Sequence, residues 1–258
     1  VTYETLTYET DYDAKVATVT LHTPASSARV GRVRCEEVAA VWRRVRLDER
    51  INVVVLRSSE ENFFSGGLGI PGDQDGPDVW HDEVPGELIS AKWQKMWKPI
   101  VCAVQGTCSA GAFYLINESD IVICSDDATF VDPHVNAGLV SALEPIGLLR
   151  RIGLSHTLRM TLTGGDELIG AQTALAIGLV TEVVPRDQLW TSAFELAKLI
   201  AAKPSAATQG TVRAIWESLD RPYRAALEQG LIYTRLGNPI GQAEVGGRAP
   251  RVENPRIR

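Results

Sequence analysis

The stretch from Lys98 to Tyr114 reads K-P-I-V-C-A-V-Q-G-T-C-S-A-G-A-F-Y. Its first half, Ile100 to Val104, is a short apolar run, which is typical of a buried strand. A turn at Gly106 follows, and then a glycine-punctuated segment from Cys108 to Asn117 that we predict to be a helix. A strand that leads through a tight turn into a helix is the building unit of an α/β fold.

The same alternation of strand and helix continues on both sides of this stretch. Parallel neighbouring strands cannot be joined by tight turns, so the repetition predicts parallel strands connected by crossover helices. The predicted strands are Leu6 to Tyr12, Val16 to His22, Asn52 to Leu56 and Asp120 to Cys124, and the predicted helices are Arg32 to Arg46 and Glu87 to Trp97.

Beyond about Val184 no strand pattern continues, and the remaining apolar spacing is helical. We predict helices at Gln188 to Ala202, Pro204 to Leu219 and Pro222 to Leu236, and an irregular surface tail after Asn238. The chain is thereby divided into a core, residues 1–200, that carries the site, and a C-terminal helical region with a tail, residues 201–258.

Composition narrows the class of protein. The 258 residues carry a formal net charge of −6, which gives no general attraction to nucleic acid or to anionic lipid. The four cysteines have no C-x-x-C spacing, and no apolar run is long enough to cross a bilayer. We therefore expect a cytoplasmic protein with no nucleic-acid or membrane partner. No cluster of His, Cys and Asp has metal-ligand spacing, so we expect no metal.

Two glycine-rich segments carry the candidate chemistry. The first, V-V-V-L-R-S-S-E-E-N-F-F-S-G-G-L-G-I, takes a strand into Ser65, Gly66 and Gly67, whose backbone angles allow close approach of a ligand. The second places Ser109, Ala110 and Gly111 where a helix begins, and helix N-termini hold unpaired N–H groups. Two such donors aimed at one point would form an oxyanion hole. Taken singly, each segment is equally consistent with a tight turn after a buried strand.

In four places the sequence resembles the crotonase (enoyl-CoA hydratase/isomerase) superfamily. F-S-G-G-L resembles the family's F-S-A-G-A-D, K-P-I-V-C-A-V-Q-G resembles its K-P-x-I-A-A-V-N-G, and D-I-V-I-C-S-D-D-A-T-F resembles its C-D-I-x-x-A-x-x-A-x-F. The segment from Leu162 to Pro185 resembles the family's L-T-G-x-x-x-x-A-x-x-A-x-x-x-G-L-V-x-x-V. The resemblance implies an α/β fold, a crotonase-like spiral of repeated ββα units with a helical C-terminal region. It also implies a homotrimer or a hexamer.

The resemblance assigns roles to individual residues. It implies that the substrate is an acyl-CoA thioester, that no separate cofactor is needed, and that the amides of Leu68 and Gly111 form the oxyanion hole. Contacts to substrate or CoA are implied for Ser65, Gly66, Gly67, Ile70 and Ala110.

The two glutamates that activate water in the family's hydratases correspond here to Tyr114 and His134. Tyrosine is a poor base at neutral pH, whereas histidine titrates where a general acid or base is useful. His134 is therefore the leading acid/base candidate, although it could also line a pocket without titrating, and Tyr114 could simply pack. Glu144, in S-A-L-E-P-I-G, is a third candidate; it either faces the substrate or lies at a helix start, capping or exposed to solvent.

Several functions remain open at this stage. The broad expectation is an enoyl-CoA hydratase/isomerase that stabilises an enolate. An acyl-CoA isomerase or hydrolase with a single base is an alternative, as is a non-catalytic CoA-binding relative. T-C-S-A-G, from Thr107 to Gly111, also resembles a nucleophile elbow without its first glycine, which leaves a serine hydrolase at Ser109 as the last alternative.

Overall fold

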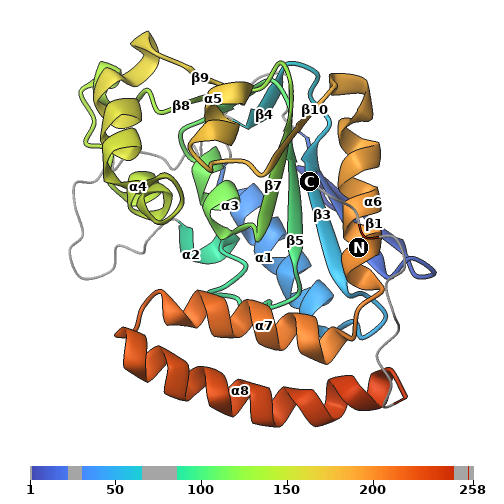
Figure 1. The fold of residues 1–258 in the computed structure, drawn as a ribbon. Helices are drawn as coiled ribbons and strands as arrows, with labels where there is room; N and C mark the ends of the chain where they lie inside the picture. Colours follow the sequence, from blue (N-terminus) through green and yellow to red (C-terminus); the bar gives the residue numbers. More distant parts are fainter. Residues whose placement is uncertain (1, 23–30, 66–85, 247–254, 256–258) are drawn as a thin grey trace.

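The computed structural model describes residues 2–22, 31–65, 86–246 and 255. Two sheets form its centre (Figure 1). The larger has six strands in the order β1-β2-β3-β5-β7-β10, and the smaller has four in the order β4-β6-β8-β9. The strands of the larger sheet are β1 (Leu6–Asp11), β2 (Val16–Leu21), β3 (Val53–Ser58), β5 (Ile100–Val104), β7 (Ile121–Ser125) and β10 (Glu182–Val184).

Each turn of the chain adds one strand to each sheet and then a helix. β5 is followed by β6 (Thr107–Ser109) and α3 (Ala112–Glu118), and β7 by β8 (Thr129–Val131) and α4 (Leu143–Thr163). Within the large sheet only β1 and β2 are antiparallel. The predicted α/β fold with repeated ββα units is confirmed. The smaller sheet is completed by β4 (Phe63–Ser65) and β9 (Ile169–Gly170).

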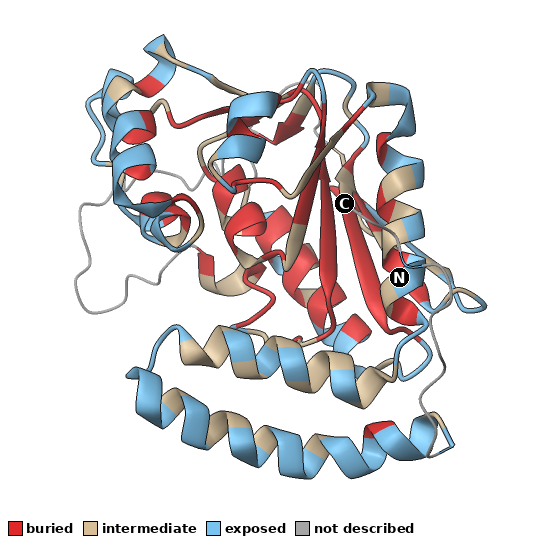
Figure 2. Cartoon of the chain, viewed as in Figure 1, coloured by how far each residue is buried: buried red, intermediate tan, exposed pale blue. Residues whose placement is uncertain are grey.

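Helices cover both faces of the large sheet, and its central strands are buried (Figure 2). Because side chains alternate along a strand, Val53 and Val55 pack toward α6 (Leu189–Ala201), while Val54 and Leu56 pack toward α1 (Arg32–Leu47). This explains why the strands read as continuous apolar runs rather than alternating ones. The short helix α2 (Gly86–Ile89) contacts α1 and α3, and the short helix α5 (Ala171–Ala176) contacts β9 and β10.

Three sequence predictions about these elements are wrong. Cys108 and Ser109, predicted to begin a helix, belong instead to the strand β6, which pairs in parallel with β8. The helix expected at residues 87–97 ends at Ile89, where the Glu118 carboxylate accepts hydrogen bonds from the Ser90 hydroxyl and the Lys92 amide at 2.7 and 3.0 Å.

The third correction concerns the C-terminus. The final helix α8 (Tyr223–Glu244) runs through Pro239 into the tail that was expected to be irregular. Its last residue, Glu244, accepts hydrogen bonds from the amides of Ser205 and Ala206, the first residues of α7 (Ser205–Ser218). The carboxylate thus satisfies free N–H donors at the start of α7, the antiparallel neighbour of α8.

The division into a core and a C-terminal region at residues 200 and 201 stays a prediction. No helix in the described ranges is both long and apolar enough to span a bilayer.

Gly106 carries the chain from the large sheet to the small one. Its φ is +57°, and a Cβ there would lie 2.2 Å from the carbonyl carbon of Asn62. Gly106→Ala should therefore lower the free energy of unfolding by about 3 kcal/mol, combining left-handed backbone strain with a backbone clash. Urea denaturation measures this loss.

Gly138→Ala is the matched control. Gly138 also has a positive φ, +71°, but a Cβ added there would have no atom of a described residue within 4 Å of it. This variant should lose only the backbone contribution, about 1 kcal/mol. Equal losses in the two variants would show that the close approach to Asn62 is unimportant.

Candidate active site

Two strands of the small sheet end side by side and send out the segments that carry the candidate groups. β6 ends at Ser109 and β8 at Val131, and these residues are partners in the parallel register. The amide of Ala110 donates to the carbonyl of Val131 at 3.2 Å, so the two segments stay together past the last strand residue. Gly111 and His134 consequently leave the same edge of the sheet from neighbouring strands.

The backbone at Gly111 is held in an unusual conformation. Ala110 has a φ of +51°, which is rare for a residue with a side chain and costs about 1–3 kcal/mol. Gly111 follows as the residue before α3, and its amide makes no hydrogen bond to any described residue. Within the described part of the chain, the amide predicted to stabilise an oxyanion is therefore left free to donate. Four other predicted residues, Gly66, Gly67, Leu68 and Ile70, lie outside the described residues.

Ser65 is the last described residue before that gap. It ends β4 and is fully buried, and its hydroxyl has no hydrogen-bond partner in the described part of the chain. A buried hydroxyl without a partner costs free energy. Its predicted contact with the substrate stays a prediction.

His134 is oriented by a buried aspartate. Asp132, immediately after β8, is 0% exposed, and its Oδ1 accepts a hydrogen bond from His134 Nδ1. This bond raises the pKa of His134 above its ordinary value, against the opposing effect of partial burial. Burial would raise the pKa of Asp132, yet hydrogen bonds from His134 and Ser141 hold it below its ordinary value. The carboxylate is thus ionised and the imidazole holds its proton to higher pH.

Glu144 lies in the first turn of α4 and faces the same cluster. It is 9% exposed, so the solvent-exposed alternative is wrong, while its position at the start of a helix is as expected. Burial raises the pKa of its carboxyl, while its own amide and His134 lower it in part. Its main-chain carbonyl accepts a hydrogen bond from Asn117 Nδ2 at 2.8 Å, which ties this turn of α4 to α3. Gly147 permits the close contact, because a Cβ there would lie 2.3 Å from the same nitrogen.

Tyr114 comes to this cluster from α3. Its ring packs on Gly86 of α2, where a Cβ would lie 2.5 Å from ring carbons. Burial raises the pKa of the phenol far above its ordinary value, and the Glu144 charge raises it further. Tyr114 is therefore a neutral hydrogen-bond donor rather than a base. The three candidates Tyr114, His134 and Glu144 come from three different helical segments, and the fold brings them together.

Sequence reasoning missed two polar groups of this cluster. They are Asp132 and Ser141. The position of Asp132, two residues before His134, was a weak indication that it could bind the histidine, whereas nothing in the sequence pointed to Ser141. Ser109, the proposed nucleophile, forms no hydrogen bond to a histidine in the described residues, and those residues contain no group of three or more metal-ligating side chains.

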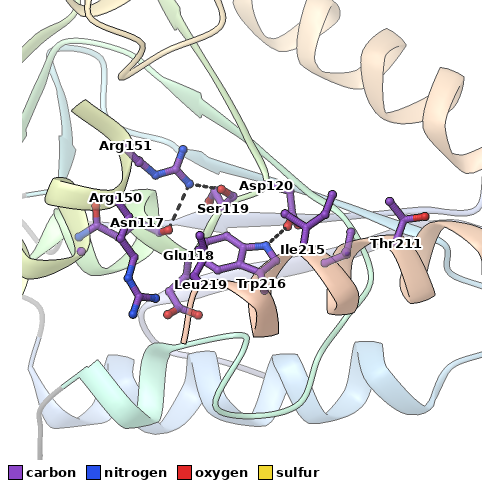
Figure 3. Close-up of a pocket in the computed structure, with 12 residues that line it drawn as sticks. Asn117, Glu118, Ser119, Asp120, Arg150, Arg151, Thr211, Ile215, Trp216 and Leu219 are labelled. Carbon is purple, nitrogen blue, oxygen red and sulfur yellow. Dashed lines mark hydrogen bonds between the residues drawn. The ribbon is translucent and has the colours of Figure 1, made fainter. Parts of the chain in front are cut away.

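A separate cavity of about 290 Å³ lies between α7, the C-terminal end of α3 and the first half of α4 (Figure 3). Trp216 of α7 reaches across it and donates from Nε1 to Asp120 at 2.6 Å, and Arg151 donates to the main-chain carbonyls of Asn117 and Ser119. It contains none of the candidate acid/base groups. Its contacts anchor α7 to the core.

Comparison with known proteins identifies the family. The family model for enoyl-CoA hydratase/isomerase matches residues 11–235. The chain is 30% identical over 232 residues to (E)-benzylidenesuccinyl-CoA hydratase of Thauera aromatica, covering 86% of this chain and 85% of the relative. It is 28% identical over 229 residues to carnitinyl-CoA dehydratase of Shigella flexneri, covering 87% and 84%.

A solved structure agrees with these relatives. An enoyl-CoA hydratase/isomerase from Mycobacterium paratuberculosis superposes with a TM-score of 0.83 at 30% identity, covering 95% of this chain and 93% of that one. The expected crotonase-like spiral is thereby confirmed. With a family model spanning most of the sequence and a similar fold along its length, the chain belongs to the enoyl-CoA hydratase/isomerase family.

Proposed function

We propose that this protein adds water across the double bond of an α,β-unsaturated acyl-CoA thioester, or removes water in the reverse direction. The observation that carries the proposal is that His134 and Glu144 lie close enough for the charge of each to act on the other. Each shifts the pKa of the other, and a buried aspartate orients the histidine. The hydratase and the dehydratase among the relatives are consistent with this class of reaction.

Hydration requires two proton transfers, and the pair supplies both. Glu144 as carboxylate removes a proton from water, whose oxygen bonds to the β carbon. Electron density moves to the thioester oxygen, where the Gly111 amide, together with the predicted Leu68 amide, stabilises the enolate. His134 as imidazolium then gives its proton to the α carbon. One ionised carboxyl and one protonated imidazole can together accept one proton and donate another.

Two of the alternative functions would not require both His134 and Glu144. Double-bond isomerisation or thioester hydrolysis could use His134 alone, and a non-catalytic relative would need neither group. The buried position of Glu144 favours the two-group reaction, because an ionisable carboxyl in a partly dry site costs free energy that solvent exposure would avoid. The CoA thioester is the substrate in this proposal, so no separate cofactor takes part.

The test is turnover of a panel of enoyl-CoA thioesters that differ in acyl length and branching. Loss of absorbance from the conjugated thioester, with formation of a 3-hydroxyacyl-CoA and incorporation of ¹⁸O from labelled water, is the expected result. Movement of the double bond without ¹⁸O would favour the isomerase, and release of free CoA would favour the hydrolase. CoA binding without any turnover would favour the non-catalytic alternative.

Tyr114→Phe should have a small effect on this reaction. The neutral hydroxyl can orient substrate or Glu144 but cannot act as the base, so kcat/KM should fall by at most about tenfold, the equivalent of one hydrogen bond. Steady-state kinetics with the best substrate of the panel measures it. A loss of several orders of magnitude would instead make Tyr114 a proton-transfer group.

We also propose that the protein assembles into the trimer or hexamer that its family resemblance implies. The apolar residues of α8 are more than half exposed, and an exposed apolar row is typical of an interface. They are Leu227, Leu231, Ile232, Leu236 and Ile240. Sedimentation should give a trimer or a multiple of it, and Leu231→Glu with Leu236→Glu should dissociate it. A monomeric wild-type protein would contradict the proposal.

A further inference from the structure

We infer that Asp132 is a positioning residue that serves both proton-transfer groups at once, holding His134 through one carboxylate oxygen and the segment that leads to Glu144 through the other. The inference rests on the proposed function and extends it to a residue outside the acid/base pair. It is carried by the hydrogen bonds of a single, fully buried carboxylate.

The first oxygen fixes the histidine. Oδ1 of Asp132 accepts from the ring Nδ1 of His134 and, at 3.3 Å, from the His134 amide. An ionised carboxylate can only accept, so Nδ1 must carry a proton in both charge states of the ring. Nε2 makes no hydrogen bond to a described residue and is the nitrogen left to exchange a proton with a substrate.

The second oxygen fixes the segment before α4. Oδ2 accepts a hydrogen bond from the Ser141 hydroxyl, and Ser141 stands three residues before Glu144. Between His134 and Ser141 the chain forms the short 3₁₀ turn η1 (His134–Ala137) and reverses at Gly138, whose φ is +71°. The loop from His134 to Ser141 is therefore held to Asp132 at both of its ends. This fixes the position of His134 relative to the segment that leads to Glu144.

The surroundings of Asp132 contain few competing charges. Among the described residues, Glu144 from α4 is the other charged group that acts on His134, and the Glu144 charge helps to keep the Tyr114 phenol of α3 neutral. Asp132 itself has no exposed surface, so water cannot substitute for either of its partners. Removing its charge should alter the imidazole directly rather than through solvent.

The closing experiment compares Asp132→Asn with wild type by ¹⁵N NMR of the histidine rings and by kinetics. An asparagine of the same shape can present its NH₂ to Nδ1, which favours the other tautomer. We expect the His134 titration midpoint to move to lower pH, the Nδ1-protonated tautomer to decrease, and kcat to fall by about 100-fold or more. The His134→Gln spectrum assigns the resonance among the four histidines.

Three further measurements complete the test. Asp126→Asn, the same change at an exposed carboxylate, should alter neither signal nor rate. Ser141→Ala should lower kcat while leaving the tautomer of His134 unchanged, because it removes only the bond to Oδ2. Asp132→Glu should restore part of the titration shift, since it restores the charge.

An unchanged tautomer, midpoint and kcat in folded Asp132→Asn would overturn the inference. Failure of the proposed function has a different signature: wild type would turn over no enoyl-CoA, while the NMR changes in Asp132→Asn would still support the positioning of His134.

Discussion

His134→Gln is expected to lower kcat for enoyl-CoA hydration by about 1,000-fold, within the range that a positioned general acid or base contributes. Glutamine keeps a polar side chain of similar reach but cannot transfer a proton at neutral pH. Binding of a saturated acyl-CoA should change little, because the histidine acts on protons at the reacting carbons. Stopped-flow and steady-state measurements separate the two effects.

The pH dependence of kcat/KM in this variant tests the role of His134 as an acid more specifically than the loss of rate does. The pKa of His134 is raised, so the imidazolium is the acid present below that pKa, and activity is lost as pH rises through it. Wild-type kcat/KM should therefore fall on a basic limb that lies above the ordinary histidine value, and His134→Gln should lack this limb. His156→Gln, which changes an exposed histidine of α4, is the control that should keep the full profile.

A basic limb that survives in His134→Gln would show that another group is the acid.

The free energy of unfolding gives an independent check on the direction of the His134 pKa shift. A raised pKa in the folded state means that protonated His134 stabilises the protein at acid pH and that this contribution is lost as pH rises. His134→Gln should thus be destabilised more at pH 5 than at pH 9.

Much of the strand pattern could be predicted from the sequence, because the strands that are buried on both faces read as continuous apolar runs. Ile100–Val104 was found with its bounds correct. Cys108 and Ser109 were mistaken for the start of a helix, since the pairing of their strand with Thr129–Val131 is a contact between distant parts of the sequence that local spacing does not record. The helical extension through Pro239 was missed for a similar reason, because the cap between Glu244 and Ser205 joins two different helices.

The site was predicted unevenly. Motifs located Gly111 and His134, whose positions follow strands directly, and the strand register explains why they meet. Burial of Glu144 could not be predicted, because it depends on the packing of Asn117 against Gly147 between two helices. The paired contacts of Asp132 also depend on a loop returning through Ser141. Sequence patterns locate groups along the chain, whereas proton transfer depends on which groups the tertiary fold brings together.

Glu144→Gln is expected to cost about as much as loss of the histidine, roughly 1,000-fold in kcat, if the carboxylate is the base that activates water. Glutamine has nearly the same shape as a protonated glutamate and is uncharged, so the substitution removes only the ability of the side chain to accept a proton. Burial raises the pKa of Glu144, and wild-type activity should fall as pH decreases through that raised value. The variant should lack this acid limb. Its basic limb should move to lower pH, because the Glu144 charge helps to keep His134 protonated.

The free energy of unfolding shows whether a lower rate in Glu144→Gln comes from the loss of the base or from unfolding of the protein. An acid whose pKa is raised by folding destabilises the folded state when it is ionised, so Glu144→Gln should be at least as stable as wild type at pH 8 in urea denaturation. Glu195→Gln, at an exposed position of α6, controls for loss of one negative charge and should leave rate and pH profile intact. A stable Glu144→Gln protein that retained wild-type turnover would remove Glu144 from the mechanism. The single-base reaction through His134 would then be the better explanation, because isomerisation or thioester hydrolysis can use one titratable group, whereas hydration needs one group to activate water and another to deliver a proton to carbon.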